Sequence, residues 1–143
     1  MRDIKFRVFD NFRKKMVKQI TSYKLDRDNN IDLIVYIDKV NKTRPIFDED
    51  KQFCNDFVVM QYTGLKEKNG VEIYEGDIVE IYSKVAHTQT SGEVIYNNEA
   101  SAFMVNDLIF EQFLPITVND DIEVIGNIYE NPELIEEENK WVN

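Results

Sequence analysis

The stretch from Met60 to Ile81, MQYTGLKEKNGVEIYEGDIVEI, constrains the fold more than any other part of the chain. Three turn signals, Thr63-Gly64, Asn69-Gly70 and Glu75-Gly76-Asp77, separate short runs of β-branched and aromatic residues. Such residues favour strands, and Asn-Gly tolerates the positive φ angles that a tight type I′ hairpin turn needs. Turns this closely spaced predict the short strands of a small β-barrel rather than helices.

The segments that follow continue this pattern. We expect a polar loop over Lys84–Ser91 and strands over Gly92–Tyr96, Ala102–Val105 and about Ile122–Ile128. Together with the central strands these could close a small five-stranded barrel. The apolar segment Leu108–Leu114, just before a proline, fits either a short helical turn or a strand.

The segments that precede the central stretch are also read as β-structure. Apolar and basic residues alternate over Ile4–Phe9, which predicts a strand with one apolar face, and Lys15–Ile20 is expected to return as its hairpin partner. A helix over Phe12–Lys24 is the alternative, because apolar residues recur there at helical spacing. Ile31–Val40 predicts a third strand, and Asn41–Asn55 a loop or short irregular element.

The end of the chain predicts a helix that begins at Asn131-Pro132-Glu133 and continues to about Asn139. Asparagine suits the cap, proline the first helical position, and glutamate the positive end of the helix dipole. A helix this short is marginal alone, so we expect it to pack against its own barrel or against a neighbouring subunit.

Residues that commonly carry chemistry are scarce in this sequence. Cys54 is the only cysteine and His87 the only histidine, so neither an intramolecular disulfide nor a zinc site of the usual kind can form. We expect Cys54 to be a partly buried small residue and His87 to lie in an exposed loop. Asp26–Asp32 resembles a calcium-binding loop, but isoleucine occupies the position of the required glycine. We predict no catalytic residue, no metal site and no cofactor.

Charge is distributed unevenly along the chain. Residues 1–24 hold eight Lys/Arg against two Asp, a net charge of +6, whereas the whole chain has a net charge of −10 and the remainder therefore −16. The basic side chains cluster near the predicted hairpin turn, and glutamates line the polar side of the predicted C-terminal helix. These oppositely charged groups form the candidate interaction surface: Arg13, Lys14, Lys15, Lys18, Glu133, Glu136 and Glu137.

Three pieces of the sequence resemble the YopX family of phage and prophage proteins. They are QYTGL, KNG and IYEGDIV within 61–79, the opening MRDIKFRVFD, and the closing VIGNIYENPEL at 124–134. The opening departs from the family at Phe9, where tryptophan is more frequent, and the region from about Tyr23 to Asp56 is the least similar. The resemblance implies an SH3-like barrel, a phage-derived bacterial protein and self-association. It implies no activity and supplies no catalytic residues.

Residue patterns and resemblance together predict a mainly β (α+β) protein. We expect an N-terminal β-rich subdomain with a basic hairpin over residues 1–56, an SH3-like small β-barrel over 57–130 and an acidic helix or tail over 131–143. No apolar run is long enough to span a membrane, and basic residues interrupt the N-terminus where a signal peptide would be apolar, so we expect a cytoplasmic protein.

The functional expectation is a non-enzymatic, self-associating interaction module, in which the basic hairpin of one copy attracts the acidic helix of another. Two alternatives remain open at this point. One is an accessory protein that contacts nucleic acid through the basic hairpin, although the acidic remainder would repel phosphate. The other is an acidic inhibitor of a host protein.

Overall fold

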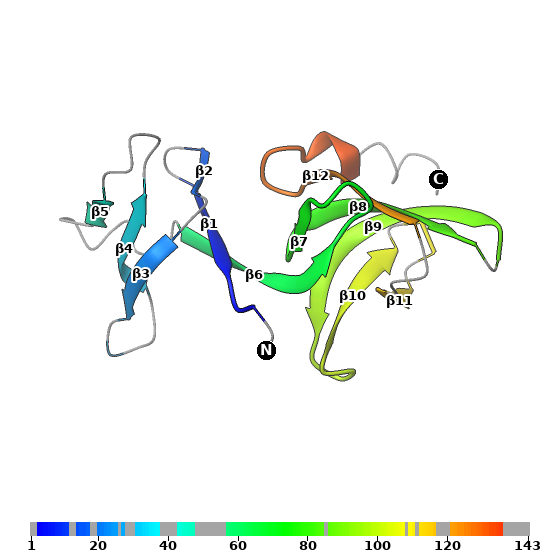
Figure 1. Cartoon of the computed structure of the whole chain (residues 1–143), viewed down its shortest axis with the longest axis horizontal. Coiled ribbons are helices and arrows are strands. Elements are labelled where there is room, and N and C mark those ends of the chain that lie inside the picture. Colours follow the sequence, from blue (N-terminus) through cyan, green and yellow to red (C-terminus); the bar gives the residue numbers. More distant parts are fainter. Residues whose placement is uncertain are drawn as a thin grey trace. The chain divides into compact units, whose positions relative to one another are not determined.

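The computed structural model describes residues 3–11, 14–17, 20–25, 27, 31–37, 43–47, 57–84, 86–107, 109–110, 112–116 and 121–135 (Figure 1). The chain divides into two compact units. The N-terminal unit is Lys5–Gln61, and the C-terminal unit is Tyr62–Asn143 together with Met1–Ile4. The predicted boundaries after residues 56 and 130 stay predictions.

The N-terminal unit begins with the predicted hairpin. Strand β1 (Phe6–Asp10) pairs antiparallel with β2 (Lys15–Val17), with Val8 opposite Val17. The next element, β3 (Ile20–Leu25), is also a strand, so the alternative of a helix over Phe12–Lys24 is wrong. As strands, β2 forms backbone hydrogen bonds with β1, and β3 forms them with β4. A helix over this segment would leave one edge of β1 without a partner strand.

The expectation that β1 has one apolar and one polar face is wrong. Arg7, Val8, Phe9 and Asp10 are all buried. β1 pairs with β2 on one edge and with β6 (Phe57–Lys66) on the other, and its charged residues are buried together with its apolar ones although the two kinds alternate. Ile4, expected in this strand, precedes it and is exposed.

A second, three-stranded sheet in the order β3-β4-β5 completes the N-terminal unit. Its central strand β4 (Ile31–Ile37) was predicted from the β-branched run. Its edge strand β5 (Thr43–Phe47) was not predicted, because Asn41–Asn55 was expected to be a loop or a short irregular element. Pro45 and the charged residues around it obscure the signal, but an edge strand tolerates proline because one side of its backbone has no ladder partner.

Strand β6 contributes to both units. Its first residues pair antiparallel with β1, from Asp10 opposite Phe57 to Phe6 opposite Gln61. Its later residues pair with β7 (Glu72–Tyr74), with Tyr62 opposite Tyr74. The rings of these two tyrosines lie 5.4 Å apart between centroids, and Tyr62 is buried.

The turn between β6 and β7 differs from the predicted type I′ turn. Gly70 has φ +86°, but Asn69 does not have a positive φ. Gly70 N donates to Glu67 O at 2.9 Å, and Glu67 N donates to Val71 O at 2.9 Å, which makes a three-residue loop that ends in a left-handed glycine. The Glu67 carboxylate accepts hydrogen bonds from Asn69 N and Val71 N, and this local acceptor stabilises the longer turn.

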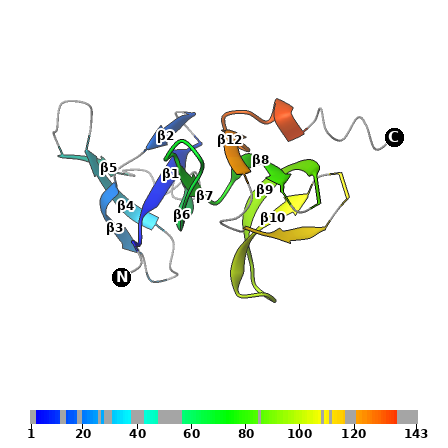
Figure 2. The same cartoon turned by 45° about the vertical axis from the view of Figure 1, so that its right-hand side comes forward.

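The C-terminal unit is dominated by a five-stranded antiparallel sheet in the order β11-β10-β9-β8-β12 (Figures 1 and 2). The sheet curls into half of a small barrel, as expected for this mainly β fold. Among the described residues, β11 and β12 stand at its two edges and do not pair with each other. The strands are β8 (Asp77–Ser83), β9 (Thr88–Asn97), β10 (Ala102–Asp107), β11 (Phe113–Pro115) and β12 (Asp121–Asn127).

Two predictions for this sheet need correction. Lys84–Ser91 was expected to be a polar loop, but β9 begins at Thr88 and pairs with β8 from Ser83 opposite Thr88. In Leu108–Leu114, residues 109–110 form a turn and Phe113 begins an edge strand, so the described part of this segment is turn and strand without helix. Pairing with β10 decides this second case, because it supplies partners that the isolated segment lacks.

The core of the C-terminal unit lies on one face of this sheet, against β7. Buried Val94, Val105 and Ile122 come from three of its strands, and Ile73 comes from β7. Leu114 of the short edge strand packs against the same cluster. The core is therefore built from non-local strand pairings, with the alternate residues of each strand left for the opposite face.

The C-terminal helix is present as one helical turn over residues 133–135, and its predicted continuation to Asn139 lies outside the described residues. Asn131 does not cap the turn in the expected way. Its Oδ1 accepts a hydrogen bond from Asn127 N at 3.2 Å, while Leu134 N donates to the Asn131 backbone carbonyl at 3.1 Å. The Asn127 amide at the end of β12 therefore takes the oxygen that would otherwise cap the helix.

Candidate interaction surface

The basic half of the predicted surface lies in the N-terminal unit. Lys14 and Lys15 are both exposed at the β1–β2 hairpin, and Lys14 adopts a left-handed backbone conformation with φ 51°. Arg13 and Lys18 lie outside the residues that the structure describes. The described part of the hairpin thus presents two adjacent cations to solvent.

The acidic half lies in the C-terminal unit. Glu133 is exposed in the helical turn, and its Oε1 is 3.4 Å from Asn131 Nδ2. Glu136 and Glu137 fall outside the described residues. The two halves of the predicted surface therefore belong to different compact units.

The division into units keeps the charge asymmetry, although it is smaller than the +6 against −16 of residues 1–24 and the remainder of the chain. The N-terminal unit contains twelve Lys/Arg and nine Asp/Glu, a net charge of +3. The C-terminal unit contains five Lys/Arg and eighteen Asp/Glu, a net charge of −13. The two units of one chain therefore carry net charges of opposite sign.

A further surface in the C-terminal unit was not predicted. Ile109, Phe110 and Phe113, which we call the aromatic edge, are respectively 37%, 70% and 50% exposed. They lie at or just before the edge strand β11. The only sign of this surface in the sequence was a pair of phenylalanines within four residues. A sequence does not show which of its apolar side chains stay exposed after the strands have paired.

Asp107 holds the turn that carries the aromatic edge. Its side chain is buried, and its Oδ1 accepts hydrogen bonds from Ile109 N at 2.8 Å and Phe110 N at 3.0 Å. Its Oδ2 accepts one from Thr90 Oγ1 at 2.6 Å. Asp107 N also donates to Gln112 O at 2.9 Å. The exposed ring of Phe110 is thus presented on a turn with a fixed backbone.

These hydrogen bonds also set the acidity of Asp107. Burial alone would raise the pKa of the carboxyl, but the donors Thr90, Phe110 N, Ile109 N and Gln112 outweigh burial and lower the pKa below its usual value. The group is therefore ionised at neutral pH and acts as a fixed acceptor.

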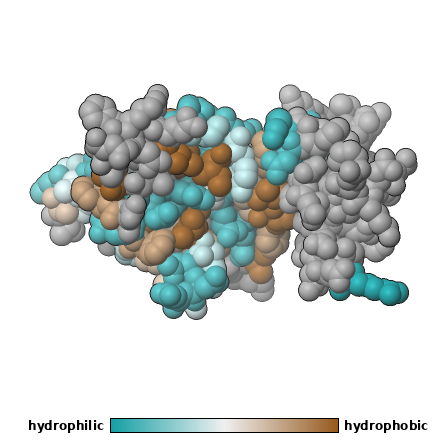
Figure 3. All heavy atoms as spheres, turned by 180° about the vertical axis from the view of Figure 1, so that it is seen from behind, coloured by the Kyte–Doolittle hydropathy of each residue, from teal (hydrophilic) through white to brown (hydrophobic). Residues whose placement is uncertain are grey.

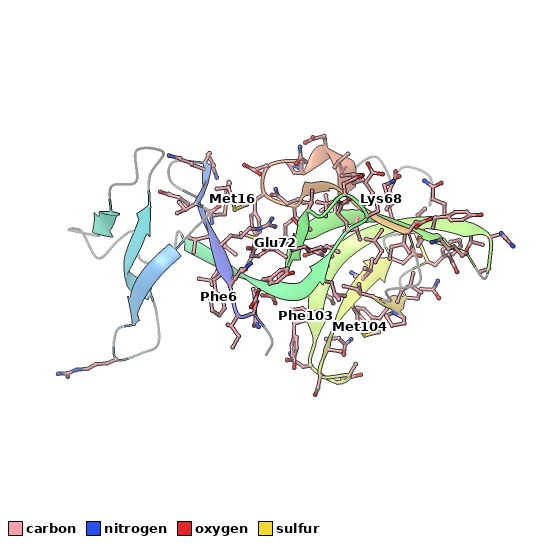
Figure 4. The ribbon with its side chains drawn as sticks, viewed as in Figure 1. Phe6, Met16, Lys68, Glu72, Phe103 and Met104 are labelled. Atoms are coloured by element: carbon pink, nitrogen blue, oxygen red, sulfur yellow. The ribbon has the colours of Figure 1, made fainter. Side chains whose placement is uncertain are left out.

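Strand register places Phe113 on the face of the sheet opposite the core. Directly opposed residues share a face, and Phe113, Asn106, Glu93 and Ile78 are opposed in turn across β11, β10, β9 and β8. Met104, two residues before Asn106, belongs to the same face, while its neighbour Phe103 projects to the other (Figure 4). We call this the outer face of the sheet.

The outer face combines apolar side chains with a carboxyl group that is partly withdrawn from water. Met104 and Ile95 are half-buried, Phe113 is exposed, and burial raises the pKa of Glu93. A space-filling view shows hydrophobic side chains interrupting the hydrophilic surface of this unit (Figure 3). The outer face thus carries exposed and half-buried apolar side chains beside a carboxyl group.

Of the cysteine and the histidine considered earlier for chemistry, the structure describes the histidine. His87 is exposed with φ 54°, and its Nδ1 is 3.3 Å from the Tyr82 hydroxyl. Cys54 lies outside the described residues. The described residues contain no cluster of three or more His, Cys, Asp or Glu side chains that could hold a metal ion. Among them there is also no helix of sufficient length and apolarity to cross a membrane.

These features define a mainly β protein with a small curled sheet and no assembled catalytic constellation among the described residues. The YopX family, described as YopX protein, matches residues 5–136, and the chain belongs to this family. The family has no known catalytic role. No curated protein matches the chain.

Two solved structures share the fold. Protein EF1440 from Enterococcus faecalis is 30% identical, with 94% of this chain and 99% of that chain covered and a TM-score of 0.61. Protein yopX from Bacillus subtilis is 22% identical, with 94% and 98% covered and a TM-score of 0.59. The architecture of the chain is thus similar to theirs over nearly its whole length.

Proposed function

We propose that this protein is a non-enzymatic interaction module that self-associates head to tail, with the N-terminal unit of one copy contacting the C-terminal unit of the next. The observation that carries the proposal is the segregation of charge between two folded units, +3 against −13. A contact between unlike units lowers the repulsion that a contact between two acidic units would create. We also propose that the protein acts in the cytoplasm of a bacterial host as a phage- or prophage-derived chain, which the family resemblance supports.

Lys14 and Lys15 supply the exposed cations of the N-terminal unit, and Glu133 belongs to the acidic surface that they would meet. Because the contact joins two different surfaces, copies would assemble into an open filament or a closed ring, of which a two-fold dimer that makes the contact twice is the smallest. We do not extend the proposal to nucleic acid, since the C-terminal unit would repel phosphate from any site on the same chain.

Sedimentation velocity at about 20 mM and about 500 mM NaCl tests the proposal, because the Debye length falls severalfold between these concentrations. We expect oligomers at low salt that dissociate at high salt. A protein that remains monomeric at micromolar concentration in both buffers would contradict the proposal.

A pair of charge-reversal variants with the same net charge sharpens the test. Lys14→Glu with Lys15→Glu removes cations from the N-terminal unit, and we expect it to shift the protein towards monomer. Lys66→Glu with Lys84→Glu changes exposed lysines of the C-terminal unit and makes that unit more acidic. This control should associate at least as strongly as the wild type. Equal effects of the two pairs would show that only the total charge matters.

A further inference from the structure

The Asn69-Gly70 turn between β6 and β7 carries chemistry that the proposed self-association does not use. An asparagine followed by glycine can cyclise, because glycine has no side chain to hinder the approach of its own backbone nitrogen to the asparagine Cγ. This pair is the only Asn-Gly in the sequence. Both residues are exposed, and no atom would lie within 4 Å of a Cβ at Gly70. Water therefore reaches the pair, and the glycine side is open.

The cyclisation is a deamidation, and its atoms balance with water as the only co-reactant. Gly70 N loses its proton and attacks Asn69 Cγ, the Cγ–Nδ2 bond breaks, and the leaving nitrogen takes up the proton and departs as ammonia. A cyclic imide remains, and water opens it at either of its carbonyls. The product is aspartate at position 69, or isoaspartate, in which the main chain passes through the former side chain. The net change replaces an NH2 group by a carboxylate oxygen.

The buried Glu67 side chain holds the asparagine in the turn. Its Oε1 accepts a hydrogen bond from Asn69 N at 2.7 Å, and its Oε2 accepts one from Asn69 Nδ2 at 3.3 Å. Oε1 also accepts a hydrogen bond from Val71 N at 3.1 Å. Hydrogen bonds to a carboxylate are stronger than those between neutral groups. Rotation of the Asn69 carboxamide towards Gly70 N would break its contact with Oε2, so Glu67 opposes the first step.

The attacking nitrogen is engaged as well. Gly70 N donates to Glu67 O at 2.9 Å, and Glu67 N donates to Val71 O at 2.9 Å, so backbone hydrogen bonds close the loop. A proton that is shared with a carbonyl is harder to remove than one that faces water. Both Glu67 carboxylate oxygens already accept hydrogen bonds from other donors, so Glu67 is not placed to take the Gly70 proton as a base.

We propose that Asn69 is a self-modification site of this chain, and that Glu67 suppresses the attack of Gly70 N on Asn69 Cγ while the turn is folded. The folded protein deamidates slowly at this position, whereas an unfolded chain deamidates at the rate of a flexible Asn-Gly peptide. The change is irreversible, and it places a second carboxylate where Asn69 Nδ2 donates to Glu67 Oε2. The position therefore keeps a chemical record of unfolding. This inference does not depend on self-association.

The experiment follows the peptide that contains Asn69 by mass spectrometry during incubation at neutral pH, with and without urea. We expect the folded wild type to deamidate at least about tenfold more slowly than the wild type in urea. Folded Glu67→Ala should deamidate about tenfold faster than the folded wild type, the effect on a rate of losing one hydrogen bond to a carboxylate. In urea the two chains should react at equal rates, because the contacts of Glu67 are absent there.

Lys68→Ala is the matched control, because Lys68 belongs to the same turn but its side chain pairs with Glu123 of β12. When folded, this variant should deamidate at the wild-type rate. Comparing each variant with its own rate in urea removes any effect of the substitution on intrinsic reactivity. Asn98 is an internal control, since it is exposed but is followed by glutamate instead of glycine, and it should stay unmodified in the same samples.

Each outcome decides one part of the proposal. Absence of the modification at Asn69 in urea overturns the site, and equal rates for folded and unfolded wild type overturn the protection. A folded Glu67→Ala variant that reacts no faster than the wild type overturns the role of Glu67. Circular dichroism establishes that each variant is folded. If Glu67→Ala does not fold, Glu67→Gln replaces it, since it keeps the volume and one acceptor oxygen, and its folded rate should still exceed that of the wild type.

Discussion

Replacing Gly92 with alanine tests the closest backbone approach in the five-stranded sheet. Gly92 is buried in β9 opposite Asp107 of β10. A Cβ atom at this position would lie 2.3 Å from Asn106 O and 2.6 Å from Val105 Cγ1. Since ordinary contacts at Cβ begin at about 3.4 Å, the carbonyl would have to move by roughly 1 Å. That carbonyl belongs to the backbone of a paired strand and cannot rotate away as a side chain could.

The energetic cost follows from this geometry. Inserting one carbon into a well-packed site typically destabilises a protein by about 1 to 3 kcal/mol. We expect Gly92→Ala to reach the upper end, about 3 kcal/mol, because both strands of the β9–β10 ladder must separate locally. For a unit of this size the midpoint of thermal unfolding should fall by about 10 °C or more.

Gly70→Ala is the matched control, because it adds the same atom in open space. No atom lies within 4 Å of a Cβ at Gly70, but its φ of +86° is unfavourable for alanine. The cost is conformational strain alone, about 1 kcal/mol. Thermal and urea unfolding of both variants, followed by circular dichroism, gives the comparison. If Gly92→Ala proved no less stable than Gly70→Ala, the close approach of β9 to β10 would be refuted.

Substitutions at three charged residues probe the C-terminal unit further. Asp107→Ala should lower the free energy of unfolding by about 2 to 4 kcal/mol, since it leaves buried donors unpaired. Asp107→Asn keeps one acceptor oxygen and should lower the free energy of unfolding by less. Urea unfolding of both variants measures the difference. The pKa of Asp107 is lowered by folding, so its contribution is complete above the unfolded pKa of about 3.9 and is lost as the pH falls through the folded pKa. The stability gap between wild type and Asp107→Ala should therefore narrow below about pH 4 and stay constant above it. Burial raises the pKa of Glu93, so its ionised form destabilises the fold and Glu93→Gln should increase the free energy of unfolding at pH 7. This increase should shrink as the pH falls through the folded pKa of Glu93 towards the unfolded value of about 4.3. A gain that persists at pH 3 would show that charge burial is not its cause. Lys68 forms an exposed ion pair with Glu123, so Lys68→Ala should leave thermal unfolding unchanged within error.

Local chemistry made part of the fold predictable. Turn residues and β-branched runs identified the N-terminal hairpin, β4, β7, β8 and the core of the five-stranded sheet, because these signals act within a few residues. The Asn69-Gly70 turn was placed correctly and assigned the wrong type. The Glu67 carboxylate accepts hydrogen bonds from two backbone amides at this turn, and these hydrogen bonds favour the longer turn.

The errors arose where distant parts of the chain decide the outcome. β5 was expected to be a loop, because a strand with proline and charged neighbours becomes favourable only when β4 is available as its partner. β1 was expected to have one apolar face, but Arg7 and Asp10 are buried as well. Burial depends on what packs against a strand, and alternation along one strand does not report it.

The candidate surface was predictable only in its charge. Counting acidic and basic residues along the chain identified an asymmetry of +6 against −16, and the two units retain it at +3 against −13. The aromatic edge was not predictable, since Phe110 and Leu114 lie in one apolar segment and only the pairing of β11 shows that Leu114 enters the core while Phe110 is exposed. The predicted cluster at Arg13, Lys18, Glu136 and Glu137 stays a prediction.

The shared strand β6 limits how this chain could be divided. Residues before Tyr62 complete the pairing of β1, and residues from Tyr62 onwards complete that of β7. A cut between Gln61 and Tyr62 would leave both pairings whole, because each lies within one fragment. A cut elsewhere in β6 would remove part of a ladder and leave bare strand positions that can template aggregation, so division of the chain is expected to be tolerated best at the unit boundary.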